Sequence, residues 1–280
     1  MNRPPLTWLY APASRPELAA KAIAGDADVA VLDLEDAVAP DLKPAARQAL
    51  GELLALAGDR AVQVRVNAPD TPWFAADLAA LAGCPVELRI PKVESADQVR
   101  MLVARVRAQG LTGRLHCLLE SALGVENAFA VAAADPAVAS VGLGEADLRS
   151  ALGVGDEAGL DWARGRLVVA SRAAGLGAPA LSVYPRLRDD EGLAASCRRG
   201  RELGFLGRAA IHPAQLPVIR AAFTPSAAEV EQAAELLAGL DGAVAAGTGA
   251  LVLSDGRFVD RAMVGAARTV LALADPVRDH

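Results

Sequence analysis

Residues 28–67 read DVAVLDLEDAVAPDLKPAARQALGELLALAGDRAVQVRVN, and this stretch decides the predicted fold. Two short aliphatic runs, 29–34 and 62–66, have the length and the β-branched content of buried strands. Between them, residues 42–56 carry apolar side chains at helical spacing. The stretch therefore predicts one complete strand–helix–strand unit.

The same alternation continues through most of the chain. Further segments with helical spacing lie at 16–24, 95–109 and 160–174. Short aliphatic runs that suit strands recur at 7–11, 29–34, 62–66, 86–90, 115–119, 138–143, 180–184 and 208–211. Repeats of roughly 25 to 35 residues fill the length of a (β/α)8 TIM barrel, an α/β fold, which is our predicted fold class. An open doubly wound sheet is the alternative, but no GxGxxG follows the first run and no GxxxxGK[ST] occurs, which argues against dinucleotide-binding and P-loop folds.

The chain continues beyond the last predicted strand. Helical stretches near 213–222 and 226–238 precede a glycine-rich segment with Asp255-Gly256 and a final helix from about 261. No linker rich in proline, glycine and serine separates this tail from the rest. We therefore predict a catalytic barrel over 1–222 and a C-terminal helical extension and lid over 223–280, both parts of one structural unit.

Composition narrows the possible functions. The chain has 280 residues, 53% of them hydrophobic, a net charge of −6 and a pI near 5.2, which argues against a broad nucleic-acid surface. Its three cysteines form no CxxC pair and its three histidines lack the spacing of zinc ligands. No uninterrupted apolar stretch is long enough for a membrane span, and the N-terminus does not fit a signal peptide. We predict a cytoplasmic protein with no nucleic-acid or membrane partner.

Polar residues close several of the predicted strands. They are Asp33, Glu35 and Asp36 after the second strand, Arg65 and Asn67 at the third, Lys92 at the fourth, Glu120 at the fifth and Asp147 after the sixth. In a barrel these ends meet at one rim, where active sites form. Strand alternation points Arg65 into the barrel mouth, away from the valines that face the helices, so Asp33 or Glu35 is expected to neutralise it. A purely structural ion pair is an equally good interpretation of this contact.

Glu120 and Asp147 form a second candidate group. Each follows an apolar run without a basic neighbour in sequence, and two carboxylates that face one cavity repel unless a cation or a proton lies between them. Oxygen ligands of this kind suit Mg²⁺. The alternative is that either acid only caps the helix that follows, as Asp147 could.

Several blocks carry a resemblance to a known family. They are residues 28–38 with Lys43 and Arg47, then 64–67, 91–94, 119–125, 144–153 and 204–215. In this order and spacing, the chain resembles the citrate lyase β-subunit-like proteins of the HpcH/HpaI aldolase superfamily. One departure is that the family's first-strand arginine and Val-Pro-Gly turn are replaced by residues 6–13, LTWLYAPA, so that Arg15 is the nearby positive charge.

The resemblance implies a trimeric barrel, or a dimer of trimers, that binds Mg²⁺, or Mn²⁺, through Glu120 and Asp147. It also implies that coenzyme A, as part of the substrate, lies across the rim and that the C-terminal extension of a neighbouring subunit closes the site. Asp260 matches the position of a catalytic acid on that extension, with a helix N-cap as the alternative. The expected catalytic residues are Arg65, Asp260, Glu35 and Asp36, and the expected substrate-binding residues are Arg65, Asn67, Lys92 and Arg15.

The function expected from the resemblance is that of a carbon–carbon lyase. The enzyme would cleave or form the bond between acetyl-CoA, or a similar acyl-CoA, and a small oxo acid, on a substrate of the malyl-, citramalyl- or citryl-CoA type. The alternatives are a class II metal-dependent aldolase that acts on a free hydroxy-keto acid, an acyl-CoA thioesterase, and a non-autonomous subunit of a lyase complex. His212 is expected to be structural. Asp189, Asp190 and Glu191 match a family element near the rim, with a solvated loop as the alternative, and they are not included among the catalytic residues.

Overall fold

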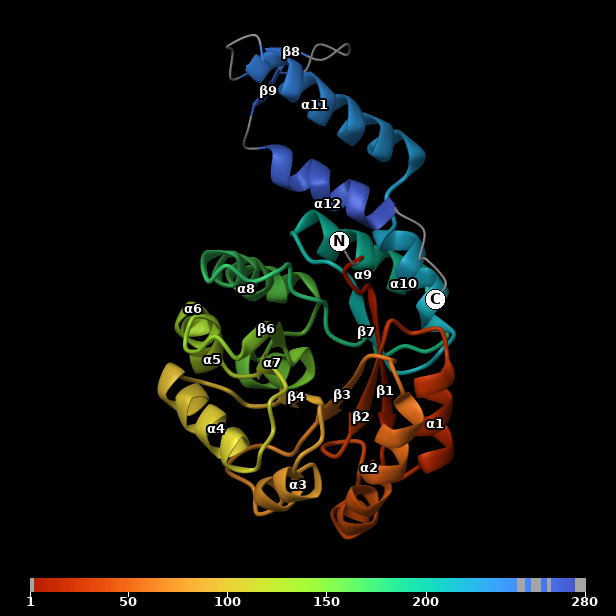
Figure 1. The fold of residues 1–280 in the computed structure, drawn as a ribbon, viewed down its shortest axis with the longest axis vertical. Coiled ribbons are helices and arrows are strands. Elements are labelled where there is room, and N and C mark those ends of the chain that lie inside the picture. Colours follow the sequence, from red (N-terminus) through yellow and green to blue (C-terminus); the bar gives the residue numbers. More distant parts are fainter. Residues whose placement is uncertain (1–2, 246–249, 253–257, 261–262, 275–280) are drawn as a thin grey trace. The chain divides into compact units, whose positions relative to one another are not determined.

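The computed structural model describes residues 3–245, 250–252, 258–260 and 263–274. Their contacts divide the chain into two compact units. One unit is Leu6–Ala222, and the other combines Met1–Pro5 with Phe223–His280 (Figure 1). The role of the second unit as a lid stays a prediction.

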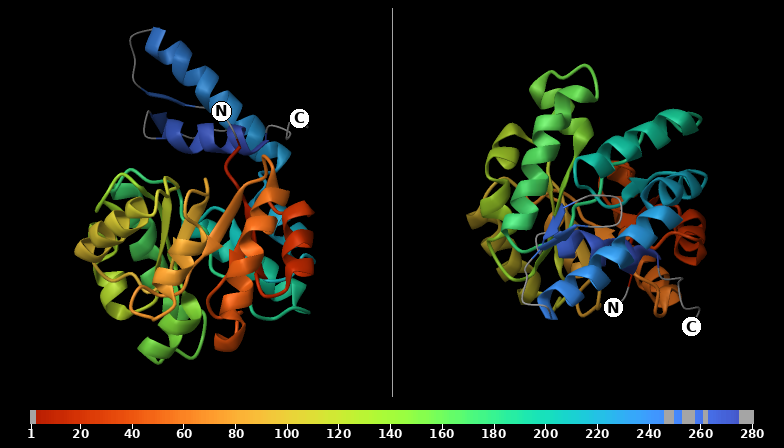
Figure 2. Two further views of the ribbon diagram at one scale, coloured as in Figure 1. Left: turned by 60° about the horizontal axis from the view of Figure 1, so that its bottom comes forward. Right: turned by 90° about the horizontal axis from the view of Figure 1, so that it is seen from above.

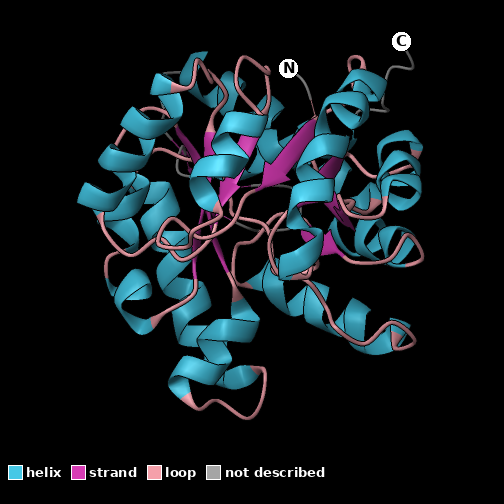
Figure 3. Cartoon of the chain, turned by 90° about the horizontal axis from the view of Figure 1, so that it is seen from below, coloured by secondary structure: helices cyan, strands magenta, loops and turns pink. Residues whose placement is uncertain are grey.

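The first unit is built on a parallel sheet. Its order is β6-β5-β4-β3-β2-β1-β7, and every neighbouring pair is parallel. The strands are β1 (Thr7–Pro12), β2 (Val29–Asp33), β3 (Val62–Arg65), β4 (Glu87–Ile90), β5 (Leu115–Leu119), β6 (Val138–Leu143) and β7 (Arg208–Ala210). Figure 3 shows the strands enclosed by helices. The strands follow one another in chain order from β1 to β6, and β7 returns to pair with β1, which confirms the predicted barrel class rather than a doubly wound sheet.

Helices connect the strands as the spacing of apolar residues predicts. Ser95, for example, accepts a hydrogen bond from the backbone N–H of Gln98 and so caps α4. The helices of this unit are α1 (Pro16–Ala24), α2 (Lys43–Ala57), α3 (Phe74–Ala80), α4 (Ala96–Ala108), α5 (Ala122–Glu126), α6 (Ala128–Ala132), α7 (Glu145–Leu152), α8 (Asp161–Ala173), α9 (Asp190–Glu202) and the start of α10 (Gln215–Phe223), with 3₁₀ turns η1 (Pro40–Leu42) and η2 (Ala158–Leu160).

The strand predicted at 180–184 is wrong. This segment makes a single parallel bridge between Leu181 and Arg208, supported by hydrogen bonds from Leu181 N to Gly207 O and from Ala209 N to Leu181 O. Pro179 and Pro185 flank the segment and carry no N–H to donate, which limits the length over which it can pair. In the described part of the chain the sheet therefore has seven strands.

Polar side chains on one face of the strands form a hydrogen-bonded network. The His116 ring contacts Glu87 and Ser140 at 2.8 Å each, and Gln63 bridges to Glu87. Arg89 donates to Gln63 at 2.7 Å. Val64 and Val66 are fully buried on the opposite face of β3, against the helices, as the strand alternation predicts.

The second unit pairs two helices with a short hairpin. Strand β8 (Ala250–Val252) runs antiparallel to β9 (Phe258–Asp260), and α11 (Ala227–Ala245) packs beside α12 (Val264–Ala274) (Figure 2). Small aliphatic residues form the contact: Ala233, Leu236, Leu240 and Ala267. Among the described helices of both units, none combines the length and the apolar character that a bilayer span requires.

Candidate active site

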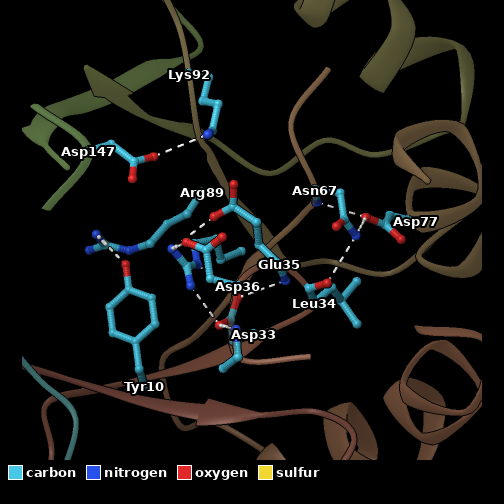
Figure 4. Close-up of polar contacts among 12 residues, drawn as sticks. Tyr10, Asp33, Leu34, Glu35, Asp36, Asn67, Asp77, Arg89, Lys92 and Asp147 are labelled. Carbon is cyan, nitrogen blue, oxygen red and sulfur yellow. Dashed lines mark hydrogen bonds and ion pairs between the residues drawn. The ribbon is translucent and has the colours of Figure 1, made fainter. Parts of the chain in front are cut away.

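Arg65 lies at the centre of a carboxylate cluster at the C-terminal end of the strands. Its Nε and Nη2 atoms donate to the two oxygens of Asp33 at 2.8 and 2.7 Å, which is a bidentate contact. Its Nη1 atom lies 2.8 Å from Glu35 and 3.3 Å from Asp36. Figure 4 shows the three acidic side chains gathered in one place. The predicted neutralisation of Arg65 is thus present, and both Asp33 and Glu35 take part in it.

Glu35 is the most unusual acid of this cluster. Only 6% of the residue is exposed, and its Oε2 atom faces Arg65 outside the angular range of a hydrogen bond, so no donor satisfies this oxygen. Burial, opposed by Arg65, raises the pKa of Glu35 to about 8. Glu35 therefore holds its proton at neutral pH more readily than an ordinary glutamic acid, which suits a group that moves protons.

The raised pKa of Glu35 predicts a pH-dependent stability. Between pH 4.5 and about 8 the folded chain keeps a proton that the unfolded chain has lost, so the free energy of unfolding falls as the pH rises. The slope is at most about 1.4 kcal/mol per pH unit. In urea denaturation at several pH values, Glu35→Gln should lose this part of the slope and gain stability relative to the unaltered protein as the pH rises. Glu52→Gln, at an exposed position of α2, is the matched control; equal slopes for Glu35→Gln and the unaltered protein would contradict the assignment.

Glu120 and Asp147 form the second cluster. Glu120 follows β5 and is 8% exposed, while Asp147 lies in the first turn of α7 with half of its side chain exposed. Burial, and then the charge of Asp147, raise the pKa of Glu120 to about 7. Gly144 makes room for this side chain, because a Cβ atom there would lie 2.3 Å from Glu120 Cγ. The two carboxylates are thus close enough to repel.

Lys92 reaches this pair from β4. Its Nζ atom lies 3.1 Å from Asp147 Oδ2 (Figure 4), and that contact raises the pKa of Lys92. Within the described ranges, Lys92 is the one non-glycine residue with a positive φ, at 54°. A side chain with a Cβ rarely adopts this conformation, and such strain is often found at functional sites.

The carboxylate pair fits a magnesium ion. No three His, Cys, Asp or Glu side chains among the described residues lie close enough together to enclose a metal. Mg²⁺ commonly takes only one or two protein carboxylates and completes its octahedral shell with water and substrate oxygens. The buried Glu120, whose ionisation is opposed by burial and by Asp147, is a carboxylate that a divalent cation would stabilise.

Asn67 serves as a connector between loops. Its side-chain amide donates to Leu34 O and Asp77, its backbone N–H also donates to Asp77, and its Oδ1 accepts from Lys43 Nζ at 2.6 Å. Lys43 is buried and also donates to the carbonyls of Leu34 and Glu35. Sequence reasoning missed Asp77. The only signal was that Asp77 is the single acidic residue in the apolar segment 74–80. The polar atoms of Asn67 are thus already hydrogen-bonded within the protein. Substrate binding by Asn67 stays a prediction.

A cavity of about 390 Å³ adjoins the Arg65 cluster. The loops that follow β2 and β3 form most of its wall, and Lys92, from the loop after β4, also lines it. Its polar and aromatic lining includes Glu35, Asp36, Lys43, Asn67, Trp73 and Lys92. Four of the predicted catalytic and substrate-binding positions therefore line one cavity: Glu35, Asp36, Asn67 and Lys92.

Three further positions were singled out in the sequence: Arg15, Asp260 and His212. Arg15 pairs with Glu17 at 2.8 Å on the surface. Asp260 is the last residue of β9, and its side chain lies outside the described part of the structure, so its role as a catalytic acid or as a helix N-cap stays a prediction. His212 is exposed and accepts from Ala214 N, which is a structural contact.

The acidic segment after residue 188 does not form the solvated loop that was the alternative interpretation. Asp189 is the N-cap of α9 and accepts from Gly192 N and from the Tyr184 hydroxyl. Asp190 and Glu191 belong to the first turn of that helix, where negative charge is favourable.

Comparisons with known proteins identify the family of the chain. The family model "HpcH/HpaI aldolase/citrate lyase" matches residues 6–213. A (3S)-malyl-CoA thioesterase of Cereibacter sphaeroides is 38% identical, over 96% of this chain and 94% of that protein. An L-malyl-CoA/β-methylmalyl-CoA lyase of the same species is 36% identical, over 98% and 96%.

A solved structure extends the similarity to the fold. It is the protein CitE from Mycobacterium tuberculosis in complex with magnesium, acetoacetate and coenzyme A, which is 36% identical, covers 96% of this chain and 98% of its own, and has a TM-score of 0.80. The sequence blocks, the barrel and the family match lead to one conclusion. The chain belongs to the HpcH/HpaI aldolase/citrate lyase family.

Proposed function

We propose that this protein is a Mg²⁺-dependent acyl-CoA lyase, which cleaves or forms the carbon–carbon bond between acetyl-CoA and a small 2-oxo acid. The observation that carries the proposal is the pairing, at one rim, of a fixed guanidinium at Arg65 with the repelling carboxylates of Glu120 and Asp147. Support comes from the malyl-CoA lyase relative and from the CitE complex that contains magnesium and coenzyme A.

Arg65 would hold the oxygen atoms of the small acid. Its contact with Asp33 fixes the plane of the guanidinium, and Nη1 is directed toward Glu35 and Asp36 at the cavity. A protonated Glu35 adds no negative charge at this place, so an anionic substrate meets less repulsion than the number of acids suggests. A rigid donor of this kind stabilises the negative oxygen that develops as the bond breaks.

Glu120 and Asp147 would hold the metal ion. Bound Mg²⁺ supplies Lewis-acid stabilisation of negative charge on a substrate oxygen. Before the ion binds, the Lys92 ammonium partly compensates Asp147. Lys92 is then available at the cavity wall to contact the substrate, as the sequence predicts.

Proton transfer is assigned to acids of the rim. Glu35, with its raised pKa, is suited to accept or return a proton near neutral pH, and the exposed Asp36 lies beside it. Asp260 is kept as the proposed acid for the acetyl-CoA enolate, and this assignment rests on the resemblance alone. Arg15 is likewise kept as a proposed contact for coenzyme A.

A second candidate function is hydrolysis of the thioester. The relative at 38% identity is a (3S)-malyl-CoA thioesterase, and the same clusters could hold a malyl-CoA whose thioester carbonyl is attacked by water. A free-acid aldolase would instead act without coenzyme A, and a partner-dependent subunit would be inactive when purified alone. Each of these functions therefore predicts a different set of products.

The condensation direction tests the proposal. Purified protein is incubated with acetyl-CoA, glyoxylate and Mg²⁺, and the thioester products are separated by chromatography and identified by mass spectrometry. We expect malyl-CoA to form with Mg²⁺ present. With a chelator present, no malyl-CoA should form. Release of free coenzyme A without malyl-CoA would favour the thioesterase, and no change in acetyl-CoA would contradict the lyase.

The assembly and location are also proposals. A homotrimer, or a dimer of trimers, and a place in the cytoplasm follow from the resemblance and from the composition of the chain. Sedimentation of the purified protein would test the trimer, for which a single species of about three chain masses is expected.

A further inference from the structure

A buried arginine, Arg164, contacts the helix that carries Asp147. Arg164, on α8, is 1% exposed, and its guanidinium contacts Glu145 through two parallel hydrogen bonds. Nε donates to Oε1 and Nη2 donates to Oε2, both at 2.8 Å. Glu145 is itself only 9% exposed. Water therefore cannot readily replace either group as the hydrogen-bond partner of the other.

The contact belongs to a longer chain of polar groups. Arg164 Nη2 also lies 3.1 Å from Glu157, which in turn accepts from the Ser196 hydroxyl of α9. Ser196 accepts from Arg208 of β7 at 2.7 Å. The guanidinium of Arg164 is therefore held from several sides, and it offers Glu145 a fixed partner rather than a mobile one.

Glu145 is the first residue of α7, the helix that carries Asp147. The N-cap of this helix is Gly144, which has no side chain and makes no capping hydrogen bond. Gly144 also packs closely on Glu120, since a Cβ atom at Gly144 would lie 2.3 Å from Glu120 Cγ. The position of the first turn is thus determined by Glu145 and Arg164 on one side and by the packing on Glu120 on the other.

We infer that Arg164 and Glu145 are positioning residues for the metal site, which rests on the proposed function of Glu120 and Asp147. Arg164 fixes the first turn of α7 through Glu145, and this fixes Asp147 relative to Glu120. A site with only two protein carboxylates depends on their separation, because no further side chain of the described residues compensates for a displacement. Neither Arg164 nor Glu145 is among the proposed metal ligands or substrate contacts, so both would act through Asp147.

The test measures metal affinity rather than turnover. The double variant Glu145→Leu with Arg164→Met removes both charges of the pair together, so neither member is left buried without the other and the net charge near the site does not change. Mn²⁺ binding is titrated by electron paramagnetic resonance of the free ion, on protein shown to be folded by circular dichroism. We expect the dissociation constant to rise roughly 10-fold to 100-fold, the range for groups that orient metal ligands.

Two further variants complete the design. Arg199→Gln, on α9, removes an exposed ion pair with Asp161, which lies on α8 together with Arg164. We expect this variant to bind Mn²⁺ like the unaltered protein. Arg164→Lys keeps the charge but not the two parallel bonds, and we expect an intermediate affinity. If the double variant does not fold, Arg164→Lys carries the test.

The outcomes separate the inference from the proposed function. Unaltered Mn²⁺ affinity in the folded double variant, or in Arg164→Lys where that carries the test, would overturn the positioning role and leave a structural ion pair. Failure of the unaltered protein to bind Mn²⁺, or equal binding by Glu120→Gln, would overturn the metal site itself, and the inference with it.

Discussion

Replacement of Glu120 by glutamine is expected to abolish Mg²⁺-dependent turnover while the barrel stays folded. The amide has the shape of the carboxyl group but cannot supply a charged ligand, so we expect kcat to fall by about 1,000-fold or more, equivalent to about 4 kcal/mol. Because burial and Asp147 oppose the ionisation of Glu120, the neutral amide should not lower the melting temperature. Turnover and thermal unfolding are measured on the same preparation.

Matched variants make the Glu120 result specific. Asp147→Asn should lose turnover as well, since it removes the other proposed ligand. Glu126→Gln changes an exposed acid at the end of α5 and should behave like the unaltered protein. Turnover by Glu120→Gln that still responds to Mg²⁺ would remove Glu120 from the site.

Replacement of Arg65 by lysine is the second large effect that we expect. An ammonium group cannot make the two parallel contacts with Asp33 and at the same time direct a donor toward Glu35 and the cavity. Turnover should fall by about 100-fold or more, and the free energy of unfolding should fall by about 1–3 kcal/mol because buried acceptors of Asp33 lose their donors.

The Arg65→Lys result is assessed by steady-state kinetics with denaturant unfolding alongside. Arg100→Lys, which changes an exposed arginine of α4 paired with Asp97, is the control for the substitution itself. If Arg65→Lys lost stability but kept its turnover, the Arg65 cluster would be a structural ion pair, the alternative that strand alternation alone leaves open.

Repeat length and the absence of phosphate-loop motifs favoured the barrel, and strand alternation and strand ends predicted which side chains gather at its rim. Val64 and Arg65 show why, since neighbouring residues of one short strand must face opposite sides, and only one side can bury an arginine among acids. The segment 180–184 shows the limit of this reasoning. Its apolar pattern suits a strand, but pairing depends on backbone donors that its flanking prolines lack.

Contacts between distant residues explain most of what the sequence could not predict. Asn67 meets Lys43, 24 residues earlier, and Glu145 meets Arg164, 19 residues later, and neither separation follows a helical or strand period. The raised pKa of Glu35 also depends first on its burial, and the nearby charge of Asp36 adds to it. Periodicity predicts which face a side chain takes, but the identity of its partner depends on how the loops pack.

Cleavage of malyl-CoA by the purified chain, with acetyl-CoA and glyoxylate measured separately, tests the central claim most directly. With Mg²⁺ present, the account predicts that the two products appear in equal amounts and that a chelator stops both. Free coenzyme A and malate without glyoxylate would contradict it, because those products come from hydrolysis of the thioester with the carbon–carbon bond intact.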